Sequence, residues 1–166
     1  MTAPTVFVVY ASRSGGTAGI AEQIAEHLEE AGATVVLSNA ESALPPDRAD
    51  AVVLGSSVYM GRWDGDARRW AKNNRDALHE VPVWLFSSGP LDETATKGEA
   101  EAPPGGERIA SLLEAKEHMV FGGRLTEDSG GFVARKLIEQ GRSGDYRDPE
   151  QIREWAGKIA AEIGLT

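Results

Sequence analysis

The sequence predicts a three-layer α/β fold, with helices on both faces of a five-stranded parallel sheet. Two observations predict it. Apolar runs that suit strands buried on both faces alternate along the chain with amphipathic helical segments. A stretch rich in serine and glycine, Ser12–Thr17, joins the first apolar run to the first helix. Right-handed crossovers place helices on both faces, so we expect a ligand crevice at the carboxyl edge of the sheet.

The apolar runs set the expected strands. They are Thr5–Tyr10, Ala33–Leu37, Ala51–Gly55, Val81–Phe86 and His118–Gly122. The first helix follows Ser12–Thr17 and is expected to run through Ala31, because apolar residues recur every four positions and Gly32 then ends it. Further helices are expected over Asp66–Leu78, after Glu107, over Gly131–Gln140 and after Asp148.

The last helix carries a clear start signal. We expect Asp148 to be its N-cap, with Pro149 at the first helical position and Gln151 in the place of a capping-box residue. The segment Leu91–Glu107 contains Pro103-Pro104-Gly105-Gly106 and is predicted to be a mobile loop.

Composition narrows the class of protein. The 166 residues fit a single domain, residues 1–166. The chain has no cysteine, so disulfides, iron–sulfur clusters and cysteine nucleophiles are excluded, and we expect no metal site. The net charge of -9 argues against nucleic acid as a partner. We find neither a signal peptide nor an apolar run of the roughly 20 residues that a membrane span needs, and expect a cytoplasmic protein without an integral membrane segment.

The loop after the first strand has the parts of a phosphate site. Its backbone N–H groups, hydroxyls and helix N-terminus favour an anion, and its residues are Ser12, Arg13, Ser14, Gly15, Gly16 and Thr17. No lysine follows the glycines, so it is not a Walker A loop, and it lacks the GxGxxG pattern of dinucleotide sites. A phospho-accepting receiver domain is disfavoured, because Ala11-Ser12 and Gly55-Ser56 stand where that domain needs acidic residues.

Two more loops should open on the same edge and suit a flat heteroaromatic ring. Aromatic faces from Tyr59 and Trp63, with glycines that permit close backbone approach, would hold such a ring. The residues expected to line it are Ser56, Ser57, Val58, Tyr59, Met60, Gly61 and Trp63 in one loop, and Ser87, Ser88, Gly89, Pro90 and Leu91 in the other.

Charged and catalytic side chains give a weaker signal. Arg13 and Arg62 lie near the expected site and suit a phosphate or a reduced, negatively charged ring. The histidines show no catalytic grouping, and His79 and His118 are expected at the opposite edge of the sheet. Catalytic residues therefore stay undetermined, as in proteins whose cofactor supplies the chemistry.

At these three loops the chain resembles the flavodoxin family. The similarity rests on VVYASRSGGTAGIAEQIA, DAVVLGSSVYMGRW and VWLFSSGPL, and extends more loosely to FGGRL and the final helix. Within the family it is most similar to the group that contains menaquinone-dependent protoporphyrinogen oxidase. The resemblance implies a flavodoxin-like fold, an α/β three-layer sandwich whose five parallel strands have the order 2-1-3-4-5. It also implies FMN with its phosphate in the first loop and its ring between the other two, and transfer of one or two electrons at a time.

Three functions follow from this resemblance. The first is an FMN-binding redox protein, either an electron carrier or a small flavin oxidoreductase, with a redox protein or a small acceptor such as a quinone as its partner. The second is the quinone-dependent oxidase itself. That enzyme has a longer basic and aromatic stretch where this chain has the short segment Arg124–Tyr146, which does not fit quinone docking. The third is a regulatory or binding module that is flavin-free or holds a deazaflavin.

Overall fold

The computed structural model describes residues 2–13, 15–125, 132–141 and 144–165. Five parallel strands form the sheet in the order β2-β1-β3-β5-β6, and a short strand, β4, pairs antiparallel with β3. The predicted order is confirmed; the numbering shifts because β4 was not expected. The strands are β1 (Thr5–Ala11), β2 (Thr34–Asn39), β3 (Ala51–Tyr59), β4 (Arg62–Trp63), β5 (Val83–Ser88) and β6 (Glu117–Phe121).

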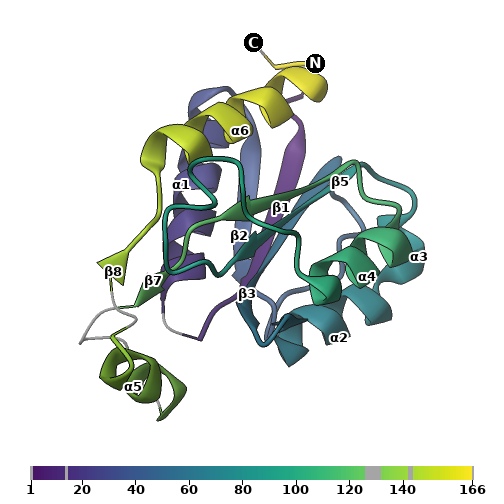
Figure 1. The fold of residues 1–166 in the computed structure, drawn as a ribbon. Coiled ribbons are helices and arrows are strands. Elements are labelled where there is room, and N and C mark those ends of the chain that lie inside the picture. The colour runs from purple at the N-terminus through teal and green to yellow at the C-terminus, as the bar shows by residue number, and fades with distance from the viewer. Residues whose placement is uncertain (1, 14, 126–131, 142–143, 166) are drawn as a thin grey trace.

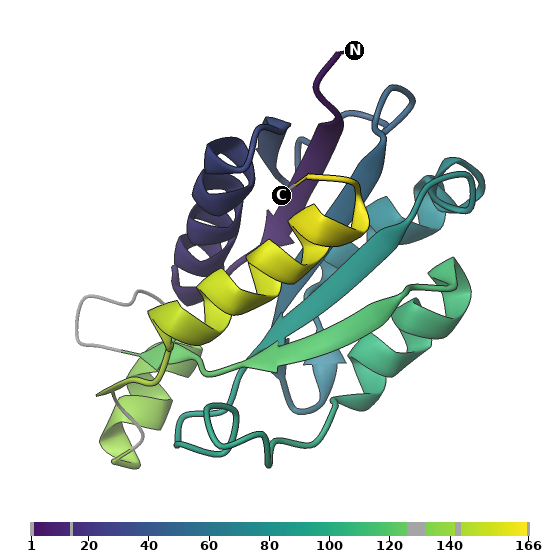
Figure 2. The same ribbon diagram turned by 90° about the horizontal axis from the view of Figure 1, so that it is seen from above.

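Helices cover the sheet in two layers, as Figures 1 and 2 show. One face carries α1 (Gly16–Glu30) and α6 (Pro149–Glu162), and the other carries α2 (Gly65–Asn73), α3 (Arg75–Leu78) and α4 (Pro104–Leu113). Three small elements lie together beyond one end of the sheet (Figure 1): β7 (Arg124–Leu125), α5 (Phe132–Glu139) and β8 (Gly144–Asp145). The antiparallel pair β7–β8 was not expected from the sequence.

Each face of the sheet has its own hydrophobic core, because alternate residues of a strand point to opposite sides. On the first face Val6, Val8 and Val53 pack against the apolar stripes of α1 and α6. On the second, Val52, Leu54 and Leu85 and their neighbours pack against α2 and α4. The three rings of Phe86, Phe121 and Trp155 meet edge to face, with centroids 5.5–6.1 Å apart. The apolar runs of β1, β3 and β5 are therefore buried on both sides, whereas β2 lies at the edge of the sheet with Val36 and Leu37 exposed.

The helix ends follow local chemistry. Gly32 ends α1 with a φ of 110°, a conformation that L side chains rarely adopt. The Asp148 side chain accepts hydrogen bonds from the N–H groups of Glu150 and Gln151, as predicted for the N-cap of α6. The capping-box prediction for Gln151 is wrong, because its side-chain amide donates to the carbonyl of Ala95 at 2.9 Å.

Several predicted boundaries need correction. Strand β3 runs four residues beyond the expected end at Gly55. The helix expected over Asp66–Leu78 is two helices that meet at Asn74. The loop predicted over Leu91–Glu107 ends early, because Pro104 already begins α4, and Ala95 within it is buried and held by Gln151. Only Phe132–Glu139 of the helix expected over Gly131–Gln140 is helical among the described residues.

Replacing Gly157 with alanine is expected to stabilise the protein. Gly157 is exposed in the middle of α6, and no described atom lies within 4 Å of a Cβ built there. Alanine restricts the unfolded chain and favours the helix, so the free energy of unfolding should rise by about 0.5–1 kcal/mol. Thermal unfolding followed by circular dichroism measures this as a midpoint roughly 1–4 °C higher. A lower midpoint would contradict the placement of Gly157 on a regular, exposed helix surface.

Candidate functional site

The carboxyl ends of three strands lie side by side. In the parallel register Ala11 of β1 stands opposite Ser56 of β3, and Ser56 stands opposite Ser87 of β5. The chain segments after these residues contain all three stretches that the sequence singled out. The expected meeting of these stretches at one edge is therefore confirmed.

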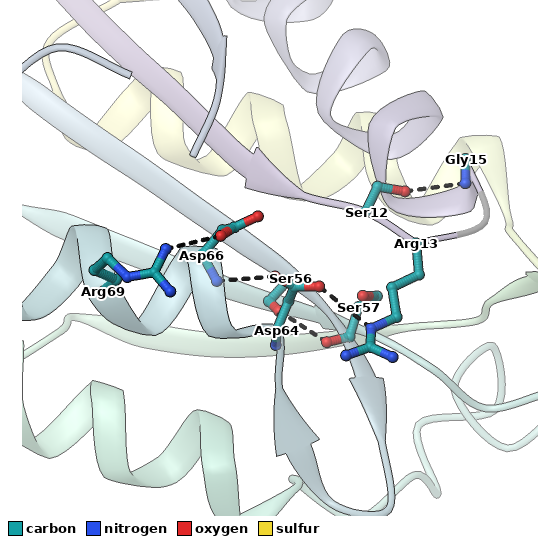
Figure 3. A network of polar contacts seen from close by, with 8 residues as sticks. All are labelled: Ser12, Arg13, Gly15, Ser56, Ser57, Asp64, Asp66 and Arg69. Atoms are coloured by element: carbon teal, nitrogen blue, oxygen red, sulfur yellow. Dashed lines mark hydrogen bonds and ion pairs between the residues drawn. The ribbon is translucent and has the colours of Figure 1, made fainter. Parts of the chain in front are cut away.

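The first stretch turns sharply into α1 (Figure 3). The hydroxyl oxygen of Ser12 accepts a hydrogen bond from the Gly15 N–H at 3.1 Å, and Gly15 has a φ of 83°. Gly15 is the N-cap of α1, and no described side chain caps the helix. The first N–H groups of the helix therefore have no intrahelical acceptor, which suits an anion in front of them. Ser14 lies outside the described residues.

The Arg13 side chain pairs with Asp64 near the start of α2. Its Nε lies 3.4 Å from a carboxylate oxygen of Asp64, and its side chain is 57% exposed. Asp64 also caps α2 by accepting from the Asp66 N–H, and its own N–H donates to the Ser56 hydroxyl at 2.8 Å (Figure 3). This network ties the turn after β1 to the start of α2. The pairing with Asp64 leaves Arg13 at the rim of the crevice rather than inside the turn.

Two arginines that the sequence did not single out stand over the first turn of α1. A Cβ built on Gly16 would lie 3.1 Å from the backbone of Arg124, and one on Gly19 would overlap the guanidinium of Arg147. The first turn, Gly16–Gly19, has no acidic residue. Cations are unfavourable beside a helix N-terminus, so this region gains from an added anion.

Asp145 of β8 holds these arginines in place. Arg147 donates to its two carboxylate oxygens at 2.9 Å and 2.7 Å, and Arg124 lies 4.0 Å away. Hydrogen bonds from the Arg147 guanidinium hold the pKa of Asp145 below its ordinary value of 3.8, and the same pairing raises the pKa of Arg147. The pair joins β8 to the N-terminal turn of α1.

The Asp145→Asn variant should unfold more easily than the wild type at pH 7. Because the folded-state pKa of Asp145 is lowered, its stabilising contribution is present above pH 3.8 and is lost as the pH falls below that value. The carboxylate is 43% exposed, so the expected effect is within about 1 kcal/mol. Urea unfolding of both proteins at several pH values measures it, with Glu150→Gln as a control for the change in net charge. A difference that persists unchanged at pH 3 would contradict the pairing.

The second stretch is a β-hairpin, which corrects the loop expected over Ser56–Trp63. Strands β3 and β4 are joined at Met60 and Gly61, whose φ values are 51° and 76°. Two consecutive positive φ values define the turn type that matches the twist of a hairpin. Tyr59 and Met60 are 41% and 83% exposed at its tip. Tyr59 is thus available to a flat ring, as expected, whereas its contact with one stays a prediction.

Trp63 does not have the place that was expected. Its ring is 2% exposed and packs in the core, and its indole Nε1–H donates to the Ser87 hydroxyl at 2.7 Å. Ser56 and Ser87 are wholly buried as well. The expectation that Trp63 offers a face to a bound ring is therefore wrong, because β4 turns this side chain inward. These three residues instead support the wall of the crevice from behind.

A pocket of about 200 Å³ lies between the second and third stretches. Its lining comes from the hairpin, the end of β5, the segment before α4 and β6, namely Val58, Ser87, Gly89, Pro90, Glu101, Pro103 and Val120. Gly89 allows the two walls to approach, since a Cβ there would lie 3.3 Å from Val58. Backbone bonds from Gly89 to Phe121 and from Gly123 to Pro90 hold the third stretch in place. The pocket is mostly apolar, with one carboxylate at Glu101.

His118 also departs from expectation. His118 is the second residue of β6, but its ring extends toward the carboxyl edge of the sheet. There Nε2 lies 2.6 Å from the Ser87 hydroxyl, and Nδ1 lies 3.2 Å from Glu107. The contacts of His118, Arg124 and Arg147 could not be predicted from a local sequence pattern, because the residues that meet are far apart in the chain.

Comparisons with known proteins agree with this architecture. A family profile described as a flavodoxin domain matches residues 7–151. A search of curated sequences finds no match. None of the helices in the described part of the chain is long and apolar enough to cross a membrane.

Among solved structures, the chain is similar to a flavodoxin from the domain Archaea, with 15% identity and a TM-score of 0.65 over 96% of this chain and 98% of that one. It is also similar to Flavodoxin 2 from Bacillus cereus, with 22% identity and a TM-score of 0.59 over 95% and 99%. Rubredoxin oxygen:oxidoreductase from Desulfovibrio gigas shares 15% identity and a TM-score of 0.63 over 98% of this chain but 37% of its own. At these identities the likeness concerns the fold.

Proposed function

Because the chain belongs to the flavodoxin domain family, we propose that it binds FMN at the carboxyl edge of the sheet and serves as an electron-transfer protein. The observation that carries the proposal is the uncapped N-terminus of α1, with Gly15 as its N-cap and Arg124 and Arg147 beside its first turn. When bound, FMN would supply reversible transfer of one or two electrons.

The residues present fit the phosphate end of FMN. The N–H groups of Gly16 and Thr17 have no acceptor within the helix, and the first turn carries no acidic residue. A phosphate there would meet the positive end of the helix dipole, and Ser12 would add a hydroxyl donor. Arg147 would act through its charge, because Asp145 already engages its guanidinium.

The ring end has a more limited space. Pockets for whole ligands usually measure about 300–1,000 Å³, so the pocket of about 200 Å³ beside Val58 would receive only part of the ring system. Tyr59 at the hairpin tip would cover the remainder. Gly89 and Pro90 would lie along its edge, where backbone groups and the carboxylate of Glu101 would influence the stability of its charged forms.

FMN and riboflavin together test the proposal, since they differ only in the phosphate. Isothermal titration of the ligand-free protein should give one FMN per chain, with riboflavin bound about 100-fold more weakly, because charge-assisted bonds at the start of α1 are missing. Equal affinities would count against the phosphate site, and the absence of both would count against flavin binding altogether.

The matches to a flavodoxin domain and to flavodoxin structures support electron transfer and give no support to protoporphyrinogen oxidation. A quinone acceptor and a cytoplasmic location remain predictions. The net charge of -9 favours a basic protein as the redox partner. A deazaflavin in the same crevice is the alternative ligand, and mass analysis of bound material distinguishes it from FMN.

A further inference from the structure

A chain of hydrogen bonds runs behind the β3–β4 hairpin. The Trp63 Nε1–H donates to the Ser87 hydroxyl at 2.7 Å, and the same hydroxyl lies 2.6 Å from His118 Nε2. The other ring nitrogen, Nδ1, lies 3.2 Å from a carboxylate oxygen of Glu107. The four residues come from β4, β5, β6 and α4, so the chain connects four separate elements.

The surrounding backbone makes room for this arrangement. A Cβ on Gly106 of α4 would overlap the His118 ring and lie 2.9 Å from Trp63 Nε1. A Cβ on Gly105 would lie 2.7 Å from the Trp63 backbone nitrogen, and the Gly105 N–H donates to the Gly61 carbonyl at 2.8 Å. The two glycines thus let the first turn of α4 close over the hairpin. The His118 side chain is consequently only 5% exposed.

The grouping of serine, histidine and carboxylate is similar to that of hydrolases, but it does not suit nucleophilic catalysis. Ser87 is wholly buried, so no substrate carbonyl can approach it. Its oxygen also accepts a hydrogen bond from the indole N–H of Trp63, a group that can only donate. The arrangement therefore acts on the structure around it and not on a substrate.

The protonation state of His118 decides the direction of these hydrogen bonds. In neutral His118, Nδ1–H donates to Glu107, so Nε2 accepts the Ser87 hydroxyl proton and every group in the chain is satisfied. When His118 is protonated, Nε2 becomes a donor and Ser87 accepts from both Trp63 and His118. The hydroxyl proton of Ser87 then has to find another acceptor inside the protein, which is unfavourable for a buried group.

We propose that His118 is a positioning residue for the flavin site: in its neutral form it fixes Ser87 and Trp63, and through Trp63 it holds the hairpin wall against which the ring binds. The groups that face it are Glu107 from α4, Ser87 from β5 and Trp63 from β4, and Glu107 is the charged group paired with it. The inference rests on the proposed FMN site, because Val58 of the hairpin lines the pocket. Protonation of His118 therefore weakens FMN binding.

The first test observes the hydrogen-bond chain without any flavin. The indole N–H signal of Trp63, assigned with Trp63→Phe, is followed by ¹H–¹⁵N NMR in the ligand-free protein from pH 5 to pH 9. We expect it to shift with a single titration in the wild type, and to stay constant in His118→Gln. The matched control is His27→Gln, which removes a half-buried imidazole near Glu30 on the opposite face and should leave the titration unchanged.

The second test measures the dissociation constant of FMN over the same pH range. The increase in this dissociation constant between pH 8 and pH 5 should be about fivefold larger in the wild type than in His118→Gln. The FMN phosphate itself titrates near pH 6, but it contributes equally to both proteins and cancels in the comparison.

The results of these two tests distinguish failure of the proposed role of His118 from failure of the proposed FMN binding. A Trp63 signal that neither changes with pH nor differs in position between the wild type and His118→Gln overturns the hydrogen-bond chain, whatever FMN does. A titrating signal with parallel FMN profiles in wild type and His118→Gln overturns the positioning role. A wild-type protein that binds no FMN at any pH overturns the proposed function and the flavin part of this inference, while the NMR titration still decides the hydrogen-bond chain.

Discussion

Replacing Gly15 with valine is expected to lower the affinity for FMN by about 100-fold or more while the protein stays folded. Gly15 has a φ of 83°, and no described atom lies within 4 Å of a Cβ built there. A branched side chain would therefore destabilise this backbone conformation by roughly 1–2 kcal/mol. It would also project into the open region at the start of α1. That region is where the phosphate would have to lie. Fluorescence quenching on titration with FMN measures the affinity.

A matched control separates loss of the site from loss of stability. Gly164, after α6, has a φ of 90° and equally open surroundings, so Gly164→Val imposes a similar backbone penalty far from the crevice. It should reduce the free energy of unfolding by a comparable amount and leave FMN affinity unchanged. Should Gly15→Val bind FMN within twofold of the wild type, the assignment of the phosphate to this turn would be wrong.

The second large effect concerns the core. Gly55→Ala should destabilise the fold by about 3 kcal/mol, near the upper end of the usual penalty for overpacking. Gly55 stands opposite Phe86 in the register of β3 and β5, and an added Cβ would overlap three atoms of the Phe86 ring. The ring cannot move aside, since it is fully buried and meets Phe121 and Trp155 edge to face.

A double-mutant cycle shows whether this contact is the cause. Phe86→Leu opens space beside position 55, so Gly55→Ala combined with Phe86→Leu should cost less than the sum of the two single changes. Urea unfolding of the four proteins gives the free energies. Additive effects would mean that residues 55 and 86 do not constrain each other.

The central strands β1, β3 and β5 were predictable because they contain continuous apolar runs, and burial on both faces requires such runs. Their order was predicted from the resemblance to the flavodoxin family. The hairpin was missed for a local reason. Its turn is Met60-Gly61, whereas the usual signal for two consecutive positive φ values is Asn-Gly or Asp-Gly. Without the turn, Trp63 seemed to lie in a loop at the crevice. With it, β4 reverses direction and directs Trp63 into the core.

The rest of the site depends on contacts between distant segments. Arg124 and Arg147 reach the first turn of α1 because Gly16 and Gly19 have no side chains to exclude them, yet more than 100 residues of sequence separate the partners. The contact between His118 and Ser87 likewise joins distant segments. It requires a glycine at position 106, because a side chain there would overlap the His118 ring. A sequence pattern with a period of two or four residues carries no information about such contacts.

FMN binding in this crevice underlies the proposed function. Its most direct test is the visible spectrum of the protein purified without added cofactor and after incubation with FMN, with mass analysis of whatever heat releases. We expect flavin absorption bands and a released mass equal to that of FMN, in one copy per chain. A colourless protein that also takes up no added FMN, or a released mass that matches a deazaflavin, would contradict it.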